Sequence, residues 1–228
     1  MGMAKATRQD AHEASRHIVS KRRVADHGEV FTRDREVNAM LDLVKDQTEV
    51  IDSRFLEPAC GHGNFLTEIL RRKLRVVEAR YGKSPLEYER YTLLAVTSIY
   101  GIDILEDNVL DCRRRLFGMV EERFRRLFRP EEFLRSIRFV LDRNIVCGDA
   151  LSLKTVSDNP MPIVFSHWSL ANGSMVKRTD FTFHELLSHG HTRQTPLFSD
   201  LGEEVFLPEP VKTHPLIHYL KLADAEAE

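Results

Sequence analysis

Apolar side chains recur every three or four positions along several stretches of the chain, and this spacing predicts amphipathic helices. The long stretches are residues 64–81, 86–96 and 107–128, and a shorter one covers 37–44. Thr32 stands where it can cap the helix that contains 37–44. The other face of the helix at 64–81 is expected to hold a basic set, namely Arg71, Arg72, Lys73 and Arg75.

Four short apolar runs predict buried strands at 54–57, 98–104, 144–151 and 162–165. These runs alternate with the helices, which is typical of crossover units on a parallel sheet. The expected fold is therefore α/β, a doubly wound, mostly parallel sheet of the Rossmann-like kind. Ligands of such sheets bind beyond the carboxyl ends of the strands.

The chain divides into three parts by composition. Residues 1–50 are expected to form an N-terminal helical arm, since 5–27 are polar and carry only sparse apolar positions. Residues 51–170 form the expected core. Residues 171–228 are expected to be an irregular C-terminal extension, because Gly, Pro, Ser and His become frequent there.

Composition narrows the classes of protein. With 228 residues, 42% of them hydrophobic, the chain can bury one core, and its formal charge of −2 gives no overall basic field for nucleic acid. The three cysteines form no CxxC pair, and the histidines of HELLSHGH (184–191) are five apart, so we expect no metal and read HELLSHGH as a surface loop. We find no membrane span or signal peptide and expect a cytoplasmic protein.

The stretch FLEPACGHGNFL (55–66) joins the first predicted strand to the long helix. Glycines allow a ligand to approach the backbone closely, and Gly61 and Gly63 fit that role. The third glycine of a dinucleotide fingerprint is missing, because Leu66 occupies its position, and no P-loop Gly-Lys-Ser/Thr follows. The turn therefore lacks the residues that bind a pyrophosphate.

Acidic residues end three successive predicted strands. Glu57 suits a cationic ammonium group, since a carboxylate attracts opposite charge at close range. Asp103 can accept ribose hydroxyls, and Asp149 can accept the amino group of an adenine. Ammonium, ribose and adenine in this order predict S-adenosylmethionine as the cofactor.

The segments GEVFT (28–32), EPACGHGNF, YGIDI and GDAL together resemble the N-terminal part of adenine-N6 DNA methyltransferases of restriction-modification systems, over about residues 24–170. The resemblance implies that Phe31 and Thr32 hold the methionine end of the cofactor. It also implies further cofactor-binding positions: Glu57, Pro58, Gly61 and Gly63 in the methionine-binding turn, Asp103 at the ribose and Asp149 at the adenine.

The catalytic motif of that family is Asn, Asp or Ser, then Pro-Pro and an aromatic residue, directly after the fourth strand. Here the corresponding place reads Ser166-His167-Trp168-Ser169. The resemblance implies that Ser166 accepts a hydrogen bond from the target amine and that Trp168 stacks on the base. His167 replaces the prolines that would aim a backbone carbonyl.

Two functions remain open. The first is an enzyme that methylates adenine N6 in DNA, with DNA bound directly or through a partner specificity subunit. The second is a non-catalytic S-adenosylmethionine-binding subunit or diverged fragment that needs a partner chain, since SHWS replaces the catalytic motif and the residues after 170 are too few for three more strands and a DNA-reading region. Methylation of RNA or protein by the same core is a weaker third reading.

Overall fold

The computed structural model describes residues 32–125, 130–171, 173–190 and 208–225. It begins with two short helices, α3 (Asp34–Asp42) and α4 (Lys45–Thr48). The residue that caps α3 is Arg33, in an extended conformation and without a side-chain hydrogen bond, so Thr32 precedes the cap by one position. Phe31 and the preceding residues of the predicted arm (1–30) lie outside the described residues.

The first sheet is mostly parallel. Its strands are β1 (Phe55–Glu57), β2 (Ile99–Asp103), β3 (Ile145–Asp149) and β4 (Lys154–Thr155), in the order β1-β2-β3-β4. β1, β2 and β3 are parallel, whereas β4 runs antiparallel to β3. The mixed α/β class and the strands predicted at 54–57, 98–104 and 144–151 are thus confirmed.

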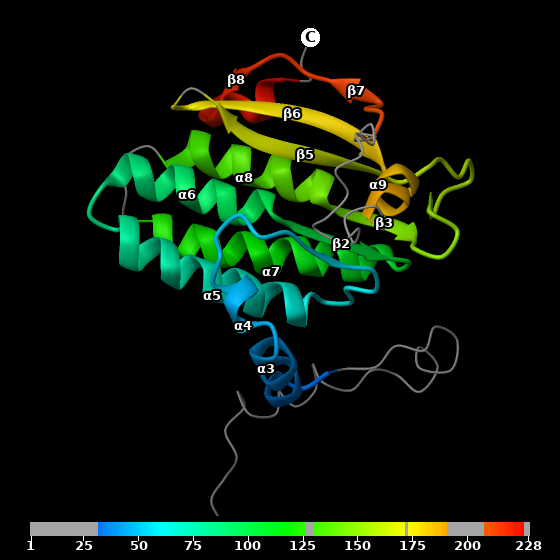
Figure 1. Cartoon of the computed structure of the whole chain (residues 1–228), viewed down its shortest axis with the longest axis horizontal. Helices are drawn as coiled ribbons and strands as arrows, with labels where there is room; N and C mark the ends of the chain where they lie inside the picture. The colour runs from blue at the N-terminus through cyan, green and yellow to red at the C-terminus, as the bar shows by residue number, and fades with distance from the viewer. Residues whose placement is uncertain (1–31, 126–129, 172, 191–207, 226–228) are drawn as a thin grey trace, which may run out of the picture.

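Each crossover between parallel strands contains two helices. α5 (Asn64–Tyr81) and α6 (Pro85–Thr97) connect β1 to β2, and α7 (Glu106–Phe124) and α8 (Pro130–Asn144) connect β2 to β3. The helix predicted at 64–81 has the bounds of α5, but α8 was not predicted. In Figure 1, α6 and α8 form a layer between α5 and α7 below and two long strands, β5 and β6, above.

The expected fourth parallel strand belongs to a second, antiparallel sheet. β5 (Val164–Ala171) pairs with β6 (Met175–Thr182), and β7 (Lys212–Thr213) and β8 (Ile217–His218) pair with β6. The prediction that the strand stops before SHWS was wrong, because β5 continues through these residues and into a hairpin. The sequence signal for that hairpin is the Asn-Gly pair at 172–173 between two runs of alternating character.

Different elements pack against the two faces of the parallel sheet. Successive side chains of a strand point to opposite faces, and β2 shows this: Ile99 belongs to the cluster that includes α5 and α7, while Tyr100 and Ile102 pack with Phe165 of β5 and Phe183 of helix α9 (Phe183–Gly190). A doubly wound sheet would carry helices on both faces. Here a β-strand of the second sheet takes much of the second face.

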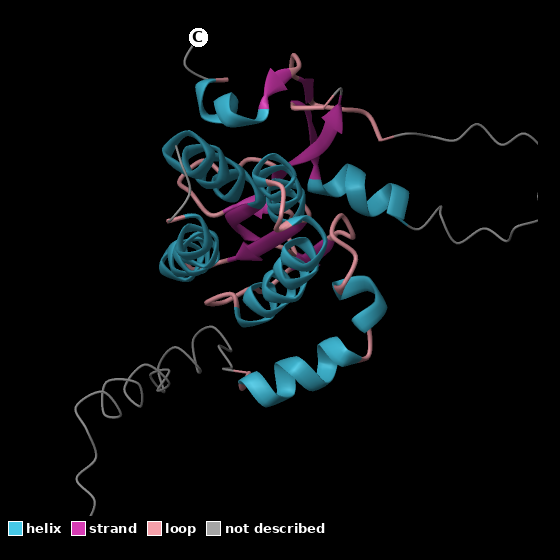
Figure 2. Cartoon of the chain, turned by 90° about the vertical axis from the view of Figure 1, so that its left-hand side faces the viewer, coloured by secondary structure: helices cyan, strands magenta, loops and turns pink. Residues whose placement is uncertain are grey.

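Beyond residue 170 the described chain is more regular than predicted. It forms β6, α9, β7, β8 and a final 3-10 helix, η2 (Tyr219–Asp224), and HELLSHGH falls largely in α9 and not in a loop. Tyr219 and Leu222 are buried in the main core, and the Tyr219 hydroxyl donates to Glu89 of α6 at 2.5 Å. Figures 1 and 2 show α3 and η2 at opposite ends of the molecule.

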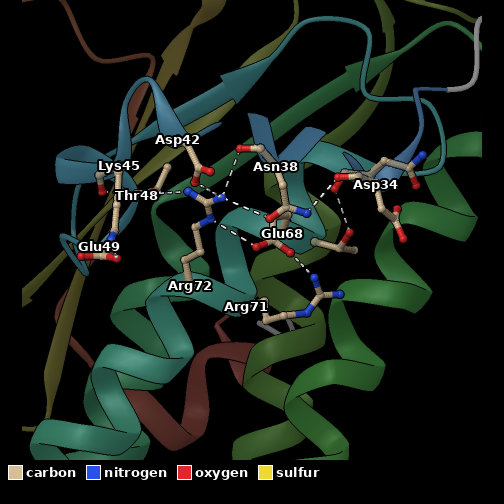
Figure 3. Close-up of polar contacts among 11 residues, drawn as sticks. Asp34, Asn38, Asp42, Lys45, Thr48, Glu49, Glu68, Arg71 and Arg72 are labelled. Carbon is tan, nitrogen blue, oxygen red and sulfur yellow. Dashed lines mark hydrogen bonds and ion pairs between the residues drawn. The ribbon is translucent and has the colours of Figure 1, made fainter. Parts of the chain in front are cut away.

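Two basic residues expected on the outer face of α5, Arg72 and Lys73, are buried. Arg72 is covered by α3 and α4, whereas the Lys73 ammonium donates to the Ile51 and Ser53 carbonyls after α4 and to the Ser98 hydroxyl. Figure 3 shows the contact: the Arg72 guanidinium donates to Asp42 at 2.8 Å, to the Asn38 side chain at 3.2 Å and to Glu68 of its own helix at 3.2 Å. Within the described ranges, no helix has the length and apolar character that crossing a membrane requires.

Candidate functional site

The three acids lie on one face of the parallel sheet, at its carboxyl edge. Glu57 pairs in register with Gly101, and Asp103 pairs with Cys147. Paired residues of parallel strands share a face, and so do residues two apart on one strand. Glu57, Asp103 and Asp149 therefore project from the same face, each one strand over and two residues further along. The sequence prediction that they line one edge agrees with this register.

The glycine turn lies between Glu57 and the start of α5. It is closed by two backbone hydrogen bonds, from Cys60 to the Ile102 carbonyl and from Gly63 to the Cys60 carbonyl, both 2.8 Å long. Gly61 (φ +50°) and Gly63 (φ +82°) have left-handed conformations. A Cβ on Gly61 would meet no atom within 4 Å, whereas a Cβ on Gly63 would lie 2.5 Å from the Cys112 Sγ. Open space for a ligand thus exists at Gly61, while Gly63 lets α7 approach.

Asp103 is buried and already accepts three hydrogen bonds. Its Oδ2 accepts from the Gly61 backbone at 2.8 Å, and its Oδ1 accepts from the Leu105 backbone at 2.9 Å and from the Asn108 amide at 3.1 Å. A carboxylate offers about four acceptor positions. Asp103 therefore shapes the glycine turn and retains about one acceptor position, fewer than the two that the sequence argument required for the ribose hydroxyls.

Glu57 and Asp149 differ in their surroundings. Burial raises the pKa of Glu57, against the opposing effect of a hydrogen bond from the Ala59 backbone. A cation beside Glu57 would favour its charged form. The pKa of Asp149 is lowered, first by the Leu151 backbone N–H, which donates to it at 2.9 Å, so this exposed carboxylate stays ionised as an acceptor.

The amino end of α5 faces the same turn. Its N-cap, Gly63, supplies no side-chain cap, so the first N–H groups of the helix and its positive dipole end suit an anion such as a carboxylate. Thr32 is held beside this end, because its carbonyl accepts a hydrogen bond from the Asn64 side chain at 3.0 Å. Pro58 is exposed at the beginning of the turn.

Two apolar residues at the same edge were not singled out from the sequence. Ile104 and Leu151 follow Asp103 and Asp149 closely and are 47% and 95% exposed. Exposed aliphatic side chains next to these acids offer apolar surface to a flat ring. The sequence signal is an apolar residue within two positions of the acid that ends each strand.

Trp168 lies at the opposite end of the parallel sheet. Its indole Nε1 donates to the Asn144 side chain at 2.9 Å, and Asn144 in turn donates to the carbonyls of Thr97 and Ile99. These residues stand at the amino ends of β2 and β3. Trp168 is 6% exposed, with its ring against Phe139 at a centroid distance of 6.2 Å. The prediction that Trp168 stacks on a base at the cofactor edge is not supported by this position.

The reason is the direction of β5. Its approach begins at the carboxyl edge, where the Ile163 side chain fills the space beside Gly148, and passes the middle of β2, where the Tyr100 hydroxyl donates to the Ser166 carbonyl at 3.0 Å. It then reaches Asn144 through Trp168. β5 therefore runs against the parallel strands and leads its residues away from the carboxyl edge.

Ser166 is engaged in a buried polar network. Its hydroxyl donates to Asp180 at 2.7 Å and accepts from the Arg178 guanidinium at 2.9 Å, and His214 contacts Asp180 at 2.8 Å. Burial opposes ionisation of Asp180, but hydrogen bonds from Arg178, Ser166 and His214 outweigh it and lower its pKa. Ser166 thus holds β5 to β6 and is 2% exposed.

No group of three or more His, Cys, Asp or Glu side chains is arranged to hold a metal ion in the part of the chain that the structure describes. Comparisons of the chain with protein-family models, with curated proteins and with solved structures gave no significant match.

Proposed function

We propose that this chain binds S-adenosylmethionine and forms the cofactor-binding part of an adenine-N6 DNA methyltransferase. One observation carries the proposal: Glu57, Asp103 and Asp149 share one face at the carboxyl edge of three parallel strands, beside a glycine turn that is open at Gly61. Cofactors of open α/β sheets bind at this edge.

Four chemical groups of the cofactor have a complementary partner there. The ammonium would pair with Glu57, whose charged form burial disfavours until a cation arrives. The carboxylate suits the uncapped start of α5. One ribose hydroxyl would bind Asp103, and the adenine would present its amine to Asp149 and its ring to Ile104 and Leu151.

Methyl transfer to adenine needs a second set of groups. The exocyclic amine becomes nucleophilic when its N–H bonds are accepted by oxygens, and the flipped base needs an aromatic surface. Ser166 and Trp168, the two residues assigned to these roles, are buried and hydrogen-bonded within the hairpin. The reading of a cofactor-binding subunit is therefore favoured, with a partner chain that supplies the base site and reads DNA.

Isothermal titration of the full chain with S-adenosylmethionine tests the cofactor site. Glu57→Gln and Asp103→Asn should each weaken binding by about ten- to a hundredfold, the effect of losing a hydrogen bond to a charged group. Glu49→Gln is the matched control, since Glu49 is exposed and, among the described residues, forms its ion pair with the neighbouring Lys45 at 3.7 Å. A wild-type chain that binds no cofactor, or acidic variants that bind as well as the control, would refute the proposal.

A methyl-incorporation assay tests whether this chain needs a partner chain for methyl transfer. Labelled cofactor and mixed-sequence DNA should give no product with this chain alone, although the cofactor binds. Product formed by the isolated chain, and lost in Trp168→Ala under conditions in which that variant is still folded, would restore the reading of a complete enzyme.

A further inference from the structure

Helix α7 contacts the glycine turn from outside the candidate cofactor site. Asp111, Cys112 and Arg115 lie within one turn of α7. The Asp111 carboxylate is 3.1 Å from the His62 Nδ1, and the Cys112 Sγ occupies the space where Gly63 would otherwise place a Cβ. Three successive contacts from one helix thus meet three residues of the turn or its flank.

Arg115 makes the most specific of these contacts. One of its guanidinium nitrogens, Nη1, donates to the His62 carbonyl at 2.5 Å and to the Asn64 Oδ1 at 2.7 Å. The peptide between His62 and Gly63 is planar, with its C=O and N–H pointing in opposite directions. Since the Gly63 N–H donates to the Cys60 carbonyl at 2.8 Å, this peptide is held from both sides. Rotating it would break both bonds.

Asn64 links the glycine turn to the N-terminal arm through hydrogen bonds. Because its Oδ1 accepts from Arg115, its Nδ2 faces the Thr32 carbonyl and donates to it at 3.0 Å. The Arg72 contacts with Asn38 and Asp42 hold the α3 that follows Thr32 against α5. A continuous set of hydrogen bonds therefore joins α7, the turn and Thr32, which precedes α3.

We infer that Arg115 and Asn64 are positioning residues for the cofactor: Arg115 fixes the turn at Gly61 in the binding geometry, and Asn64 keeps Thr32 beside it. This inference rests on the proposed function. Neither residue needs to touch the ligand, because a turn that is already ordered spares binding the free-energy cost of ordering it. Replacement of Arg115 should weaken binding through that cost, and replacement of Asn64 should weaken it by releasing Thr32 from its place beside the turn.

The test is cofactor titration of Arg115→Met, in the full chain, against Arg125→Met. Arg125 is on the C-terminal end of the same helix, is 71% exposed at its side chain and pairs with Glu121 at 3.8 Å, far along α7 from the turn. Arg115→Met should bind S-adenosylmethionine about tenfold more weakly, as expected for loss of charge-assisted hydrogen bonds. Arg125→Met should match the wild type, and Arg115→Lys should recover part of the affinity.

Asn64→Asp separates the two halves of the inference. This variant keeps an acceptor for Arg115 but loses the donor to Thr32, so its affinity should fall while the turn stays ordered. Amide hydrogen exchange of residues 60–64 measures that order directly: exchange should rise in Arg115→Met and stay unchanged in Asn64→Asp and Arg125→Met.

The outcomes separate the two proposals. Wild-type binding with unchanged affinity and unchanged exchange in Arg115→Met overturns the positioning role and leaves the proposed function standing. Absence of wild-type binding overturns the proposed function and this role together. Loss of unfolding free energy in Arg115→Met with an unchanged dissociation constant, measured where all variants are folded, assigns Arg115 to the fold alone and also overturns the inference.

Discussion

Replacement of Gly63 by alanine tests how the turn and α7 fit together. Two costs add at this position. A left-handed conformation costs an L-residue about 1–2 kcal/mol, and Gly63 has φ +82°. The new Cβ would also lie 2.5 Å from the Cys112 Sγ, and forcing an extra carbon into a packed core typically costs about 1–3 kcal/mol. Gly63→Ala should therefore lower the free energy of unfolding by about 2–5 kcal/mol.

Two other glycines provide matched controls. Gly173 has φ +78°, nearly that of Gly63, and Gly61 has φ +50°, but a Cβ on either would meet nothing within 4 Å. Gly173→Ala should show the conformational cost alone, about 1–2 kcal/mol. Gly61→Ala should cost a similar amount of stability and, in addition, weaken cofactor binding, because its methyl group would enter the open space of the candidate site.

Urea unfolding can be followed through the single tryptophan, Trp168, which is buried and will change its emission on unfolding. A double-mutant cycle isolates the clash: Cys112→Ala should relieve about 1–3 kcal/mol of the Gly63→Ala cost. Equal losses in Gly63→Ala and Gly173→Ala, together with additive effects of Gly63→Ala and Cys112→Ala, would show that α7 does not press on the turn as the structure indicates.

Three further predictions concern other parts of the molecule. Burial lowers the pKa of Lys73 to about 7 from 10.5, so in the folded protein it loses its proton before the unfolded chain does. The unfolding free energy of wild type relative to Lys73→Met should hence rise by about 1.4 kcal/mol for each pH unit between about 7 and 10, and a pH-independent difference in urea titrations would contradict the burial of a neutral lysine. Trp168→Phe should lose about 1–3 kcal/mol of stability, because the Asn144 Oδ1 loses its indole donor, with cofactor affinity unchanged; a weakened affinity would return Trp168 to the site. Leu151→Ser should weaken cofactor binding about threefold to tenfold without loss of stability. Leu43→Ser, on the arm and 85% exposed, should change neither the affinity nor the stability, both measured by calorimetry.

Local sequence patterns were sufficient to predict much of the fold. The bounds of α5 follow from apolar positions that repeat over 18 residues, and β1, β2 and β3 follow from apolar runs that each end at an acid. The missed helix α8 also has a local signal, since Phe133, Ile137, Val140 and Leu141 have helical spacing.

The acidic residues of the candidate site could be predicted from the sequence, but the residues that position the glycine turn could not. Acids that end parallel strands must meet at one edge, so the sequence order of Glu57, Asp103 and Asp149 suffices to group them. The contact of Arg115 with His62 joins residues 53 positions apart, and no spacing rule links a helix face to a turn at that distance. The same holds for Gly63, whose role depends on Cys112 of α7.

The direction of β5 determines which residues can reach the carboxyl edge of the parallel sheet. A fourth strand parallel to β1 would end at the carboxyl edge and present its next residues to the candidate site. β5 instead passes from Ile163 near that edge to Trp168 near the amino ends, held by Tyr100 and Asn144 on the way. Turning it around would break the pairing with β6 along its whole length, including the buried Ser166 and Asp180 contact. Under the proposed function, an aromatic surface for the target base would therefore have to reach the carboxyl edge from a segment other than β5, and we propose a partner chain as its source.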